Sequence, residues 1–303
     1  MLMRFLYLLP LFHLILLSHS SPSMQPLCNG DESSALLQFK ESFIINKSAS
    51  SDDHFAYPRV ESWTLEGESS NCCSWDGVSC DEDTGHVIGL DLSSSCLYGS
   101  INSNSSLFRL VHLQSLNLAH NHFKLLSNPI PDRQSFKTHI SQSLFFYVFW
   151  SLYLHDCGMY GEFPIGIFKL PNLRVLDVKY NKNLTGSLPD FQYWRSPLEE
   201  MTLADTSFSG ELPASMGNLE SLIALDMWGC NLSGSIPYSI GNLTNLIYLE
   251  LSNNSLAGNI PSSIGNLIQL AFLGLYDNQL SGPIPFGLAN LTQLTVLSLA
   301  PID

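Results

Sequence analysis

The stretch that decides the fold is Leu246-Ile-Tyr-Leu249-Glu-Leu251-Ser-Asn-Asn254-Ser-Leu256-Ala-Gly258-Asn-Ile260-Pro261. The same pattern of leucine, asparagine and glycine returns 24 residues later, and it is also present 24 residues earlier with Met227 and Cys230 in place of one leucine and the asparagine. The shared template is L-x-x-L-x-L-x-x-N-x-L-x-G-x-I-P, and self-similarity at a fixed period of this length is typical of repeat architectures.

The Asn position of this template can be followed along most of the chain. A ninth copy begins at Leu294, shortly before the last residue, Asp303. Residues 87–303 are therefore predicted to be eight repeats and a partial ninth. The Asn-type positions, separated by 26, 36, 24, 25, 24, 24 and 24 residues, are Ser95, Asn121, Cys157, Asn181, Thr206, Cys230, Asn254 and Asn278.

The chemistry of the template predicts the architecture. In L-x-L the leucines alternate with other residues, so a short strand buries one face and exposes the other. No single copy can bury its leucines alone, so the copies must stack. We predict an α/β repeat solenoid, a right-handed superhelix with a concave parallel β-sheet. The Asn side chain is expected to point inward and bond backbone groups, and Cys157, Cys230 and Thr206 to replace it as small buried side chains without a redox role.

The N-terminus has the pattern of a secretory signal peptide. Arg4 precedes an apolar run from Phe5 to Leu17, and small residues follow up to Ser23. The run is shorter than the roughly 20 residues that a membrane anchor needs. We assign residues 1–23 to a signal peptide, which predicts entry into the secretory pathway.

Residues 24–86 are predicted to cap the first repeat. A helix is expected from Asp31, with Asp31 or a following serine as N-cap and with Ala35, Leu36, Phe39 and Phe43 at helical spacing. The first repeat strand is expected to begin at Val87. Four cysteines of this region, typical of a disulfide framework in a secreted chain, are Cys28, Cys72, Cys73 and Cys80.

Those four cysteines allow three pairings. A bridge between the adjacent Cys72 and Cys73 is sterically poor, which leaves two pairings open. Zinc is disfavoured because no CxxC pair or matching histidines accompany them. Cys96, like Cys157 and Cys230, has no spacing partner and is interpreted as a buried thiol.

Seven N-x-S/T sequons accompany the signal peptide and are predicted glycosylation sites. They are Asn46, Asn104, Asn183, Asn231, Asn242, Asn253 and Asn290.

Charge and motif content exclude several classes of function. The net charge is −14, from 27 acidic and 13 basic residues, and it disfavours nucleic acid and anionic membrane surfaces as partners. The signatures of serine hydrolases, zinc proteases, phosphate-binding loops and kinases are absent. His112, His120 and His122 are interpreted as solvated, and Asp81-Glu82-Asp83 as a solvated turn. We therefore predict a protein that is not an enzyme and that has neither a metal nor a cofactor.

The chain resembles the ectodomain start of plant leucine-rich-repeat receptor-like proteins. The resemblance rests on the cap from Asp31 to Phe43, the block from Trp63 through Cys72-Cys73-x-Trp75-x-Gly77-Val78-x-Cys80, and the L-x-G-x-I-P repeats. It covers most of residues 28–123 and 149–299, and it implies a cap stapled by Cys28–Cys72 and Cys73–Cys80. It also implies a cell-surface receptor in defence or development, whose concave face binds a ligand and which signals through partner receptor kinases.

Two features depart from the family pattern. Residues 124–148 obey no repeat register and form an irregular insert. The chain also ends without the C-terminal cap, membrane span and cytoplasmic tail that the family implies. Either residues 124–148 are a loop that bulges out of the stack, or repeats were lost and foreign sequence was joined in. We favour the second hypothesis, a truncated or imperfect gene model.

The third, fifth, seventh and eighth template positions are expected to face the concave side. Exposed aromatic and acidic residues there suit a peptide or protein ligand. The alternatives to a receptor module are a secreted polygalacturonase-inhibitor-like protein and a non-functional receptor fragment. Depending on whether a membrane span follows, the protein is expected on the extracellular side of the plasma membrane or secreted. The candidate ligand-binding residues are Asp177, Tyr180, Asp205, Asp226, Trp228, Tyr248, Glu250, Phe272, Tyr276 and Asp277.

Overall fold

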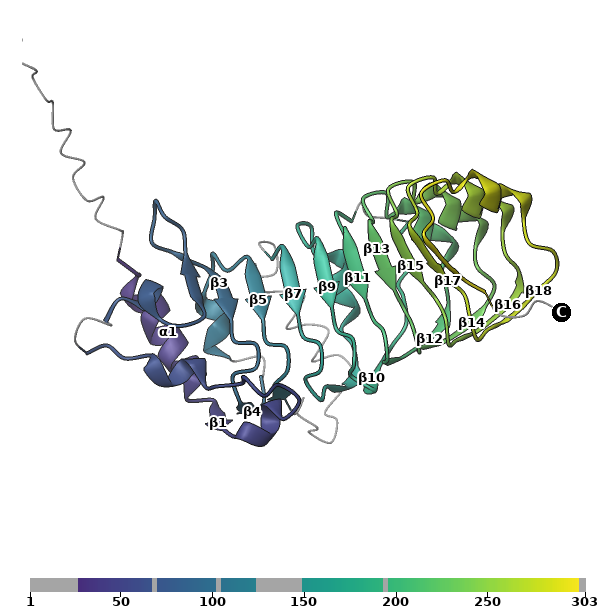
Figure 1. Ribbon diagram of the computed structural model, residues 1–303. Helices are drawn as coiled ribbons and strands as arrows, with labels where there is room; N and C mark the ends of the chain where they lie inside the picture. Colours follow the sequence, from purple (N-terminus) through teal and green to yellow (C-terminus); the bar gives the residue numbers. More distant parts are fainter. Residues whose placement is uncertain (1–26, 67–69, 102–104, 124–148, 193–195, 300–303) are drawn as a thin grey trace, which may run out of the picture.

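The computed structural model describes residues 27–66, 70–101, 105–123, 149–192 and 196–299. They form an elongated, curved stack of repeats, with the N-terminal cap at one end and the yellow C-terminal repeats at the other (Figure 1). The predicted signal peptide, Asn104 and the irregular insert lie outside the described residues. Within the described residues, no helix has the length and apolar composition needed to cross a membrane.

The main sheet has ten strands, one from the cap and one from each repeat. The cap strand β2 (Val78–Cys80) pairs antiparallel with β3, and all later pairings are parallel, which confirms the predicted parallel sheet. The repeat strands are β3 (Val87–Asp91), β5 (Ser115–Asn117), β7 (Ser151–Tyr153), β9 (Val175–Asp177), β11 (Glu200–Thr202), β13 (Ala224–Asp226), β15 (Tyr248–Glu250), β17 (Phe272–Gly274) and β19 (Val296–Ser298).

The core lies behind this sheet. The central residue of each strand points inward, and those of β9 to β17 are completely buried: Leu176, Met201, Leu225, Leu249 and Leu273. Parallel pairing in constant register places these side chains in one continuous row. The hydrophobic contribution of each repeat therefore depends on its neighbours.

The segment after the Asn-type position forms a second sheet of six strands in the repeats from Cys157 to Asn278. It runs extended and pairs with the same segment of the next repeat, because the constant spacing keeps the two in register. Its strands are β8 (Tyr160–Glu162), β10 (Asn183–Gly186), β12 (Ser207–Glu211), β14 (Asn231–Gly234), β16 (Ser255–Asn259) and β18 (Gln279–Ser281). Short 3-10 helices complete the repeats: η5 (Ser106–Arg109), η7 (Ile165–Lys169), η8 (Ala214–Asn218), η9 (Tyr238–Asn242), η10 (Ser262–Asn266) and η11 (Phe286–Asn290).

The cap begins with α1 (Gly30–Lys40), and two details of its prediction were wrong. The N-cap is Asn29, whose side-chain oxygen accepts the Asp31 N–H at 2.9 Å; Asp31 lies in the first turn, where its charge suits the helix dipole. Phe43 is not helical, because the chain leaves the helix and pairs β1 (Phe43–Ile45) with β4 (Leu97–Gly99), which pairs with β6 (His122–Phe123). The other cap elements are η1 (Lys47–Ser50), η2 (Arg59–Ser62) and η4 (Cys72–Ser74).

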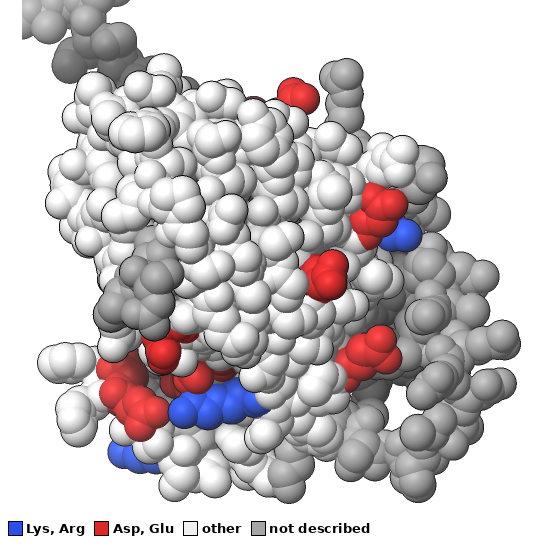
Figure 2. Space-filling model, turned by 90° about the vertical axis from the view of Figure 1, so that its right-hand side faces the viewer, with Lys and Arg blue, Asp and Glu red and all other residues white. Residues whose placement is uncertain are grey.

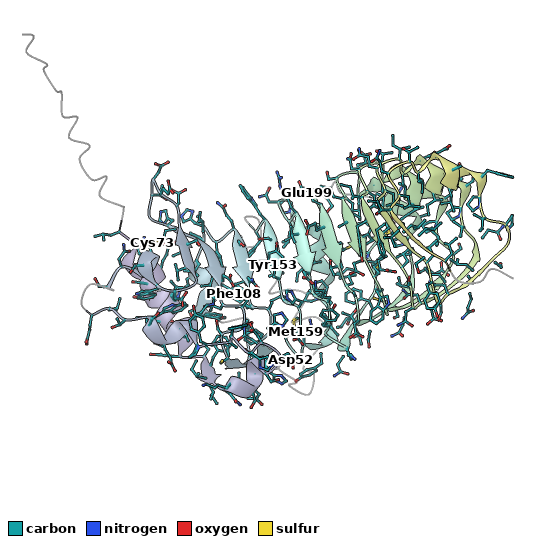
Figure 3. The ribbon with its side chains drawn as sticks, viewed as in Figure 1. Asp52, Cys73, Phe108, Tyr153, Met159 and Glu199 are labelled. Carbon is teal, nitrogen blue, oxygen red and sulfur yellow. A yellow bond between two sulfur atoms is a disulfide. The ribbon has the colours of Figure 1, made fainter. Side chains whose placement is uncertain are left out.

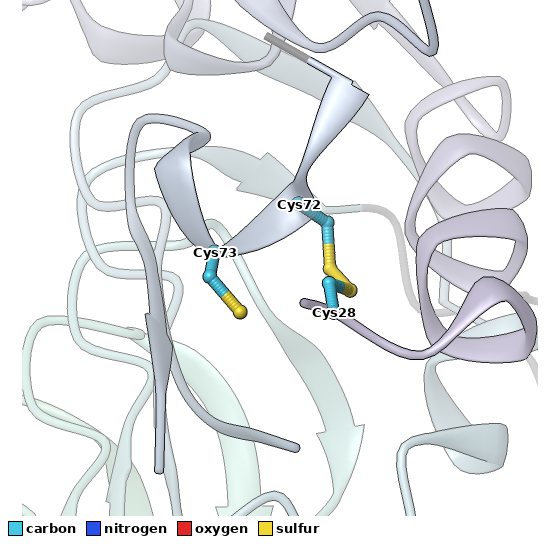
Figure 4. A group of neighbouring side chains, drawn as sticks. All are labelled: Cys28, Cys72 and Cys73. Carbon is cyan, nitrogen blue, oxygen red and sulfur yellow. A yellow bond between two sulfur atoms is a disulfide. The ribbon is translucent and has the colours of Figure 1, made fainter. Parts of the chain in front are cut away.

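Two disulfides staple the cap, Cys28–Cys72 and Cys73–Cys80, and they confirm the pairing that the family resemblance implied. Figure 4 shows Cys72 bonded to Cys28 beside the neighbouring Cys73. The sulfur atoms of these three residues lie within 4.8 Å of one another. Since all three are in disulfides, they offer no thiolate to a metal ion.

The Asn-type side chains point inward as expected. Asn121 Nδ2 donates to the Leu92 carbonyl at 2.7 Å and to the Leu118 carbonyl at 2.9 Å. Where cysteine replaces Asn, the thiol donates instead, from Cys157 to the Leu118 carbonyl at 3.1 Å. Both residue types satisfy carbonyl groups that would otherwise be buried without a partner.

Candidate ligand-binding surface

The outward-facing residues of successive strands form rows across the concave sheet. One row contains Tyr248 and Phe272, which are register partners. A second row, called here the acidic row, contains Asp177, Thr202, Asp226 and Glu250 on four consecutive strands. Figure 3 shows Tyr153 of β7 near the middle of the sheet, and it is the register partner of Asp177.

Aromatic side chains gather on β13 to β17. The rings of Tyr248 and Phe272 are stacked, with centroids 4.5 Å apart and planes at 16°. Trp228 and Tyr276 follow β13 and β17 at equivalent template positions and are 40% and 55% exposed. We call these four residues the aromatic patch. Burial, with the nearby Asp226 and Glu250 charges, raises the pKa of Tyr248 to about 12, so its phenol remains protonated at neutral pH.

Backbone hydrogen bonds hold carboxylates of the acidic row next to the aromatic patch. Asp226 Oδ1 accepts the Trp228 backbone N–H at 3.1 Å. Burial raises the pKa of Asp226, and the neighbouring Glu250 charge adds to the effect. Glu250 Oε1 accepts the Ser252 N–H at 2.7 Å. An ideal Cβ on Gly274 would lie 2.3 Å from the same oxygen, so glycine leaves room for this carboxylate.

Asp177 differs from the other acids because His155 and Lys179 lie beside it. It is only 8% exposed, and its Oδ2 lies 2.9 Å from His155 Nδ1 and 3.4 Å from Lys179 Nζ. Burial alone would raise the pKa of Asp177, but the contact and charge of His155, together with Lys179, hold it below its ordinary value. The Asp177 carboxylate is therefore largely engaged by His155 and Lys179.

Three further candidate residues sit on tight turns immediately before the Asn-type position. Tyr180, Asp205 and Asp277 have φ of 61°, 53° and 53°, in the left-handed region that asparagine and aspartate adopt most readily among non-glycine residues. The Lys179 ammonium lies 5.7 Å from the centroid of the Tyr180 ring. Lys182 Nζ lies 3.6 Å from Asp205 Oδ2, but that lysine is exposed and the pair contributes little to stability.

One pair of residues was not predicted. His120, interpreted as solvated, instead lies beside His155, which follows the neighbouring strand, and the two Nε2 atoms are 3.2 Å apart. The Asn-type positions Asn121 and Cys157 place both histidines on the concave side, and this was the available signal. His112 and His122 are exposed as expected. Asp81 Oδ1 accepts from the Thr84 N–H and hydroxyl at 2.9 and 2.8 Å, which fits the expected turn.

The three free thiols are buried. Burial raises the pKa of Cys96 and Cys157 and raises that of Cys230 to about 11. Reactive cysteines have the opposite character, a lowered pKa and an accessible sulfur. The environment therefore favours the structural interpretation of these residues.

An open hollow of about 320 Å³ lies at the edge where the strands begin. It is lined by Glu199, which Figure 3 shows at this edge, and by Ile223 and Ile247 among others. Seen from the end that carries β18, the described surface is mostly uncharged, with acidic side chains and a few Lys or Arg side chains beside them (Figure 2).

Comparisons with known proteins agree with this geometry. Residues 149–303 match the model of the leucine-rich repeat region, and residues 29–81 match the leucine-rich repeat N-terminal domain. Receptor-like protein 6 of Arabidopsis thaliana is 36% identical over 67% of this chain. Receptor-like protein Cf-9 of Solanum pimpinellifolium is 34% identical over 68% of it. The matched part covers 28% and 26% of those relatives, so the chain spans about a quarter of their length.

Solved structures show the same fold. The ectodomain of the Arabidopsis receptor kinase HAESA, in complex with the IDA peptide hormone, aligns with a TM-score of 0.70 and 31% identity, over 89% of this chain and 41% of that one. HAESA in complex with IDA and the co-receptor SERK1 aligns with a TM-score of 0.67 and 32% identity, over 91% of this chain and 42% of that one. From its repeats, its cap with two disulfides and these relatives, the chain belongs to the plant leucine-rich-repeat receptor-like proteins.

Proposed function

We propose that this chain is the extracellular ligand-recognition region of a cell-surface receptor-like protein in plant defence or development. It binds a peptide or protein on its concave face and performs no catalysis. The observation that carries the proposal is the aromatic patch lying beside the acidic row on one rigid sheet. Rigid aromatic side chains supply a large contact area at low entropic cost, and they dominate many recognition surfaces.

The charges on this surface indicate the kind of ligand. Asp226 and Glu250 lie next to the aromatic patch and are register partners on the adjacent strands β13 and β15. A cationic group of the ligand would relieve their repulsion. We therefore favour a peptide segment that combines an aromatic or aliphatic side chain with a lysine, an arginine or a free amino terminus.

The comparisons support the partners and the location in this proposal. HAESA has been solved with a peptide hormone and with the co-receptor SERK1, and we propose a receptor kinase partner for this chain by analogy. Six predicted glycosylation sites lie among the described residues, and all six are exposed: Asn46, Asn183, Asn231, Asn242, Asn253 and Asn290. Their exposure supports passage through the secretory pathway, since glycan attachment needs an accessible side chain.

The proposal can be tested with a random peptide library displayed on phage. The chain from residue 24 onward, secreted from insect cells, serves as bait, and enriched peptides are measured by calorimetry. Trp228→Ala and Tyr248→Ala should each weaken binding by about 30-fold, the effect of losing a residue that contributes about 2 kcal/mol.

The matched control is Tyr238→Ala, which removes an exposed tyrosine from η9, outside the concave sheet. It should leave the affinity unchanged. Enriched peptides that bind both concave variants as tightly as the wild type would contradict the proposed surface.

A further inference from the structure

We propose that His120 and His155 form a binding site for a zinc ion on the concave face. Their Nε2 atoms lie 3.2 Å apart, and the planes of the two rings meet at 86°. The two residues come from adjacent repeats that are separated in sequence by the irregular insert. The proposal rests on this pair and its surroundings and is independent of the proposed receptor function.

Carboxylates determine where the histidine protons lie. Asp156 Oδ2 lies 3.0 Å from His120 Nδ1, and Asp177 Oδ2 lies 2.9 Å from His155 Nδ1. The second contact is close but poorly aligned for a hydrogen bond, and its charge still favours a proton on the nearer nitrogen. In neutral rings with Nδ1 protonated, both Nε2 atoms carry only a lone pair.

Two such lone pairs repel each other at 3.2 Å, and either a metal ion between them or a proton on one Nε2 removes the repulsion. The proton is present if one ring is charged, or if one neutral ring carries its hydrogen on Nε2 instead of Nδ1. A carboxylate behind each ligating histidine is the arrangement that orients imidazole ligands in zinc sites. The proton is the competing occupant, and the experiment below distinguishes the two.

The spacing fits zinc. Two nitrogens at about 2.0–2.1 Å from one tetrahedral Zn²⁺ lie roughly 3.3–3.4 Å apart, close to the observed 3.2 Å. Imidazole is a preferred ligand of zinc. Two histidines leave two of four positions to water or to donor atoms of a bound molecule.

The surroundings favour a cation and hold the ligands in place. Asp156 and Asp177 outnumber the single nearby cation, Lys179. The histidines follow the neighbouring strands β5 and β7, and the His120 N–H donates to the His155 carbonyl at 3.0 Å. Their side chains are 37% and 19% exposed, so an ion can reach them from solvent.

The test is calorimetric titration of the secreted chain with ZnCl₂ at pH 7.5, using a purification tag without histidine. We expect one zinc ion per chain, with binding abolished in His120→Asn and in His155→Ala. Both replacements suit their positions. Asn253 occupies the left-handed position equivalent to His120, with φ of 57°, and the repeats carry alanine, at Ala119 and Ala204, where His155 lies.

Two further variants separate a specific site from a general loss of fold. Asp177→Asn, which keeps both ligands, should weaken zinc binding by about 10–100-fold, as the loss of an outer partner does. His122→Ala removes an exposed histidine that stacks on Tyr98 and should leave binding unchanged. Circular dichroism checks that every variant is folded.

Two results would overturn the proposal. A wild-type chain that takes up no zinc would show that a proton on one Nε2 joins the two histidines instead. Equal zinc binding in the wild type, His120→Asn and His155→Ala would place the ion elsewhere.

Discussion

Asn181 accepts the backbone N–H of Cys157 at 3.1 Å and thereby joins two neighbouring repeats through one side chain. Its Oδ1 also accepts the Met159 N–H, and its Nδ2 donates to the Leu154 and Val178 carbonyls at 2.9 and 2.8 Å. The side chain is 1% exposed. All of its bonding capacity is thus used inside the solenoid.

We expect Asn181→Ala to lower the free energy of unfolding by at least about 2 kcal/mol, because each buried polar group left unpaired costs about 1–3 kcal/mol. Equilibrium urea unfolding followed by circular dichroism measures the change. Lys182→Ala, which alters the exposed neighbouring residue, should stay within about 0.5 kcal/mol of the wild type. Equal stabilities of the two variants would show that water replaces the lost bonds.

The repeat spacing made the main sheet predictable. The recurring leucine pattern marks each strand, and the regular spacing identifies the strand with which it pairs. The second sheet was not predictable in the same way. In segments such as Asn231–Gly234, only one residue is buried, so no alternation marks a strand. These residues form a strand because they pair with the next repeat, and the sequence of the segment itself does not show this pairing. The N-cap was misplaced for a similar reason, since both Asn29 and Asp31 are good caps and only the start of the helix decides between them.

The strand positions of the candidate residues were predictable from the template, but the environments that distinguish these residues were not. The template positions identify Asp177 and Asp226 as equivalent, yet their neighbours on adjacent strands differ in charge. The assigned positions Asn121 and Cys157 already placed His120 and His155 at concave positions of consecutive repeats. That signal could have found the pair, but the distance between the two rings and the carboxylates beside them come only from the structure.

The 3-10 helices stack so closely that we predict any side chain at Gly241 to destabilise the fold. An ideal Cβ at this position would lie 2.3 Å from the Ser263 carbonyl oxygen of the next repeat. We expect Gly241→Ala to lower the free energy of unfolding by about 1–3 kcal/mol through the backbone shift that it forces. Gly30→Ala, where nothing lies within 4 Å of the new Cβ, is the control and should not destabilise. A neutral Gly241→Ala in urea unfolding would show that the repeats can separate at no cost.

Because the three free thiols are buried, we predict that they react slowly with thiol reagents. With a pKa of about 11 for Cys230, roughly one thiol in a thousand is ionised at pH 8, and only the thiolate reacts. We expect the folded chain to resist a disulfide reagent such as DTNB at pH 8, and three thiols per chain to react after unfolding in guanidinium. Rapid labelling of one thiol in the folded chain would identify an accessible cysteine and contradict the structural role.

Asp177 and Asp226 occupy the same position on β9 and β13 and should affect stability with opposite signs. The pKa of Asp177 is lowered in the folded state, because His155 and Lys179 outweigh burial. Its contribution is therefore present above the ordinary value of 3.8 and disappears as pH falls through the lowered pKa. The pKa of Asp226 is raised by burial and by Glu250, so its ionised form destabilises the fold once pH exceeds the raised value.

Asp177→Asn should accordingly reduce the free energy of unfolding at pH 7, whereas Asp226→Asn should increase it. An asparagine at 226 can still accept the Trp228 N–H through its side-chain oxygen, so the second variant removes the charge and keeps the bond. Both differences from the wild type should shrink at pH 3, where carboxylates become protonated. Urea unfolding at pH 7 and pH 3 measures all four values. If the two variants changed stability in the same direction at pH 7, the neighbouring charges would not be the cause of the opposite pKa shifts.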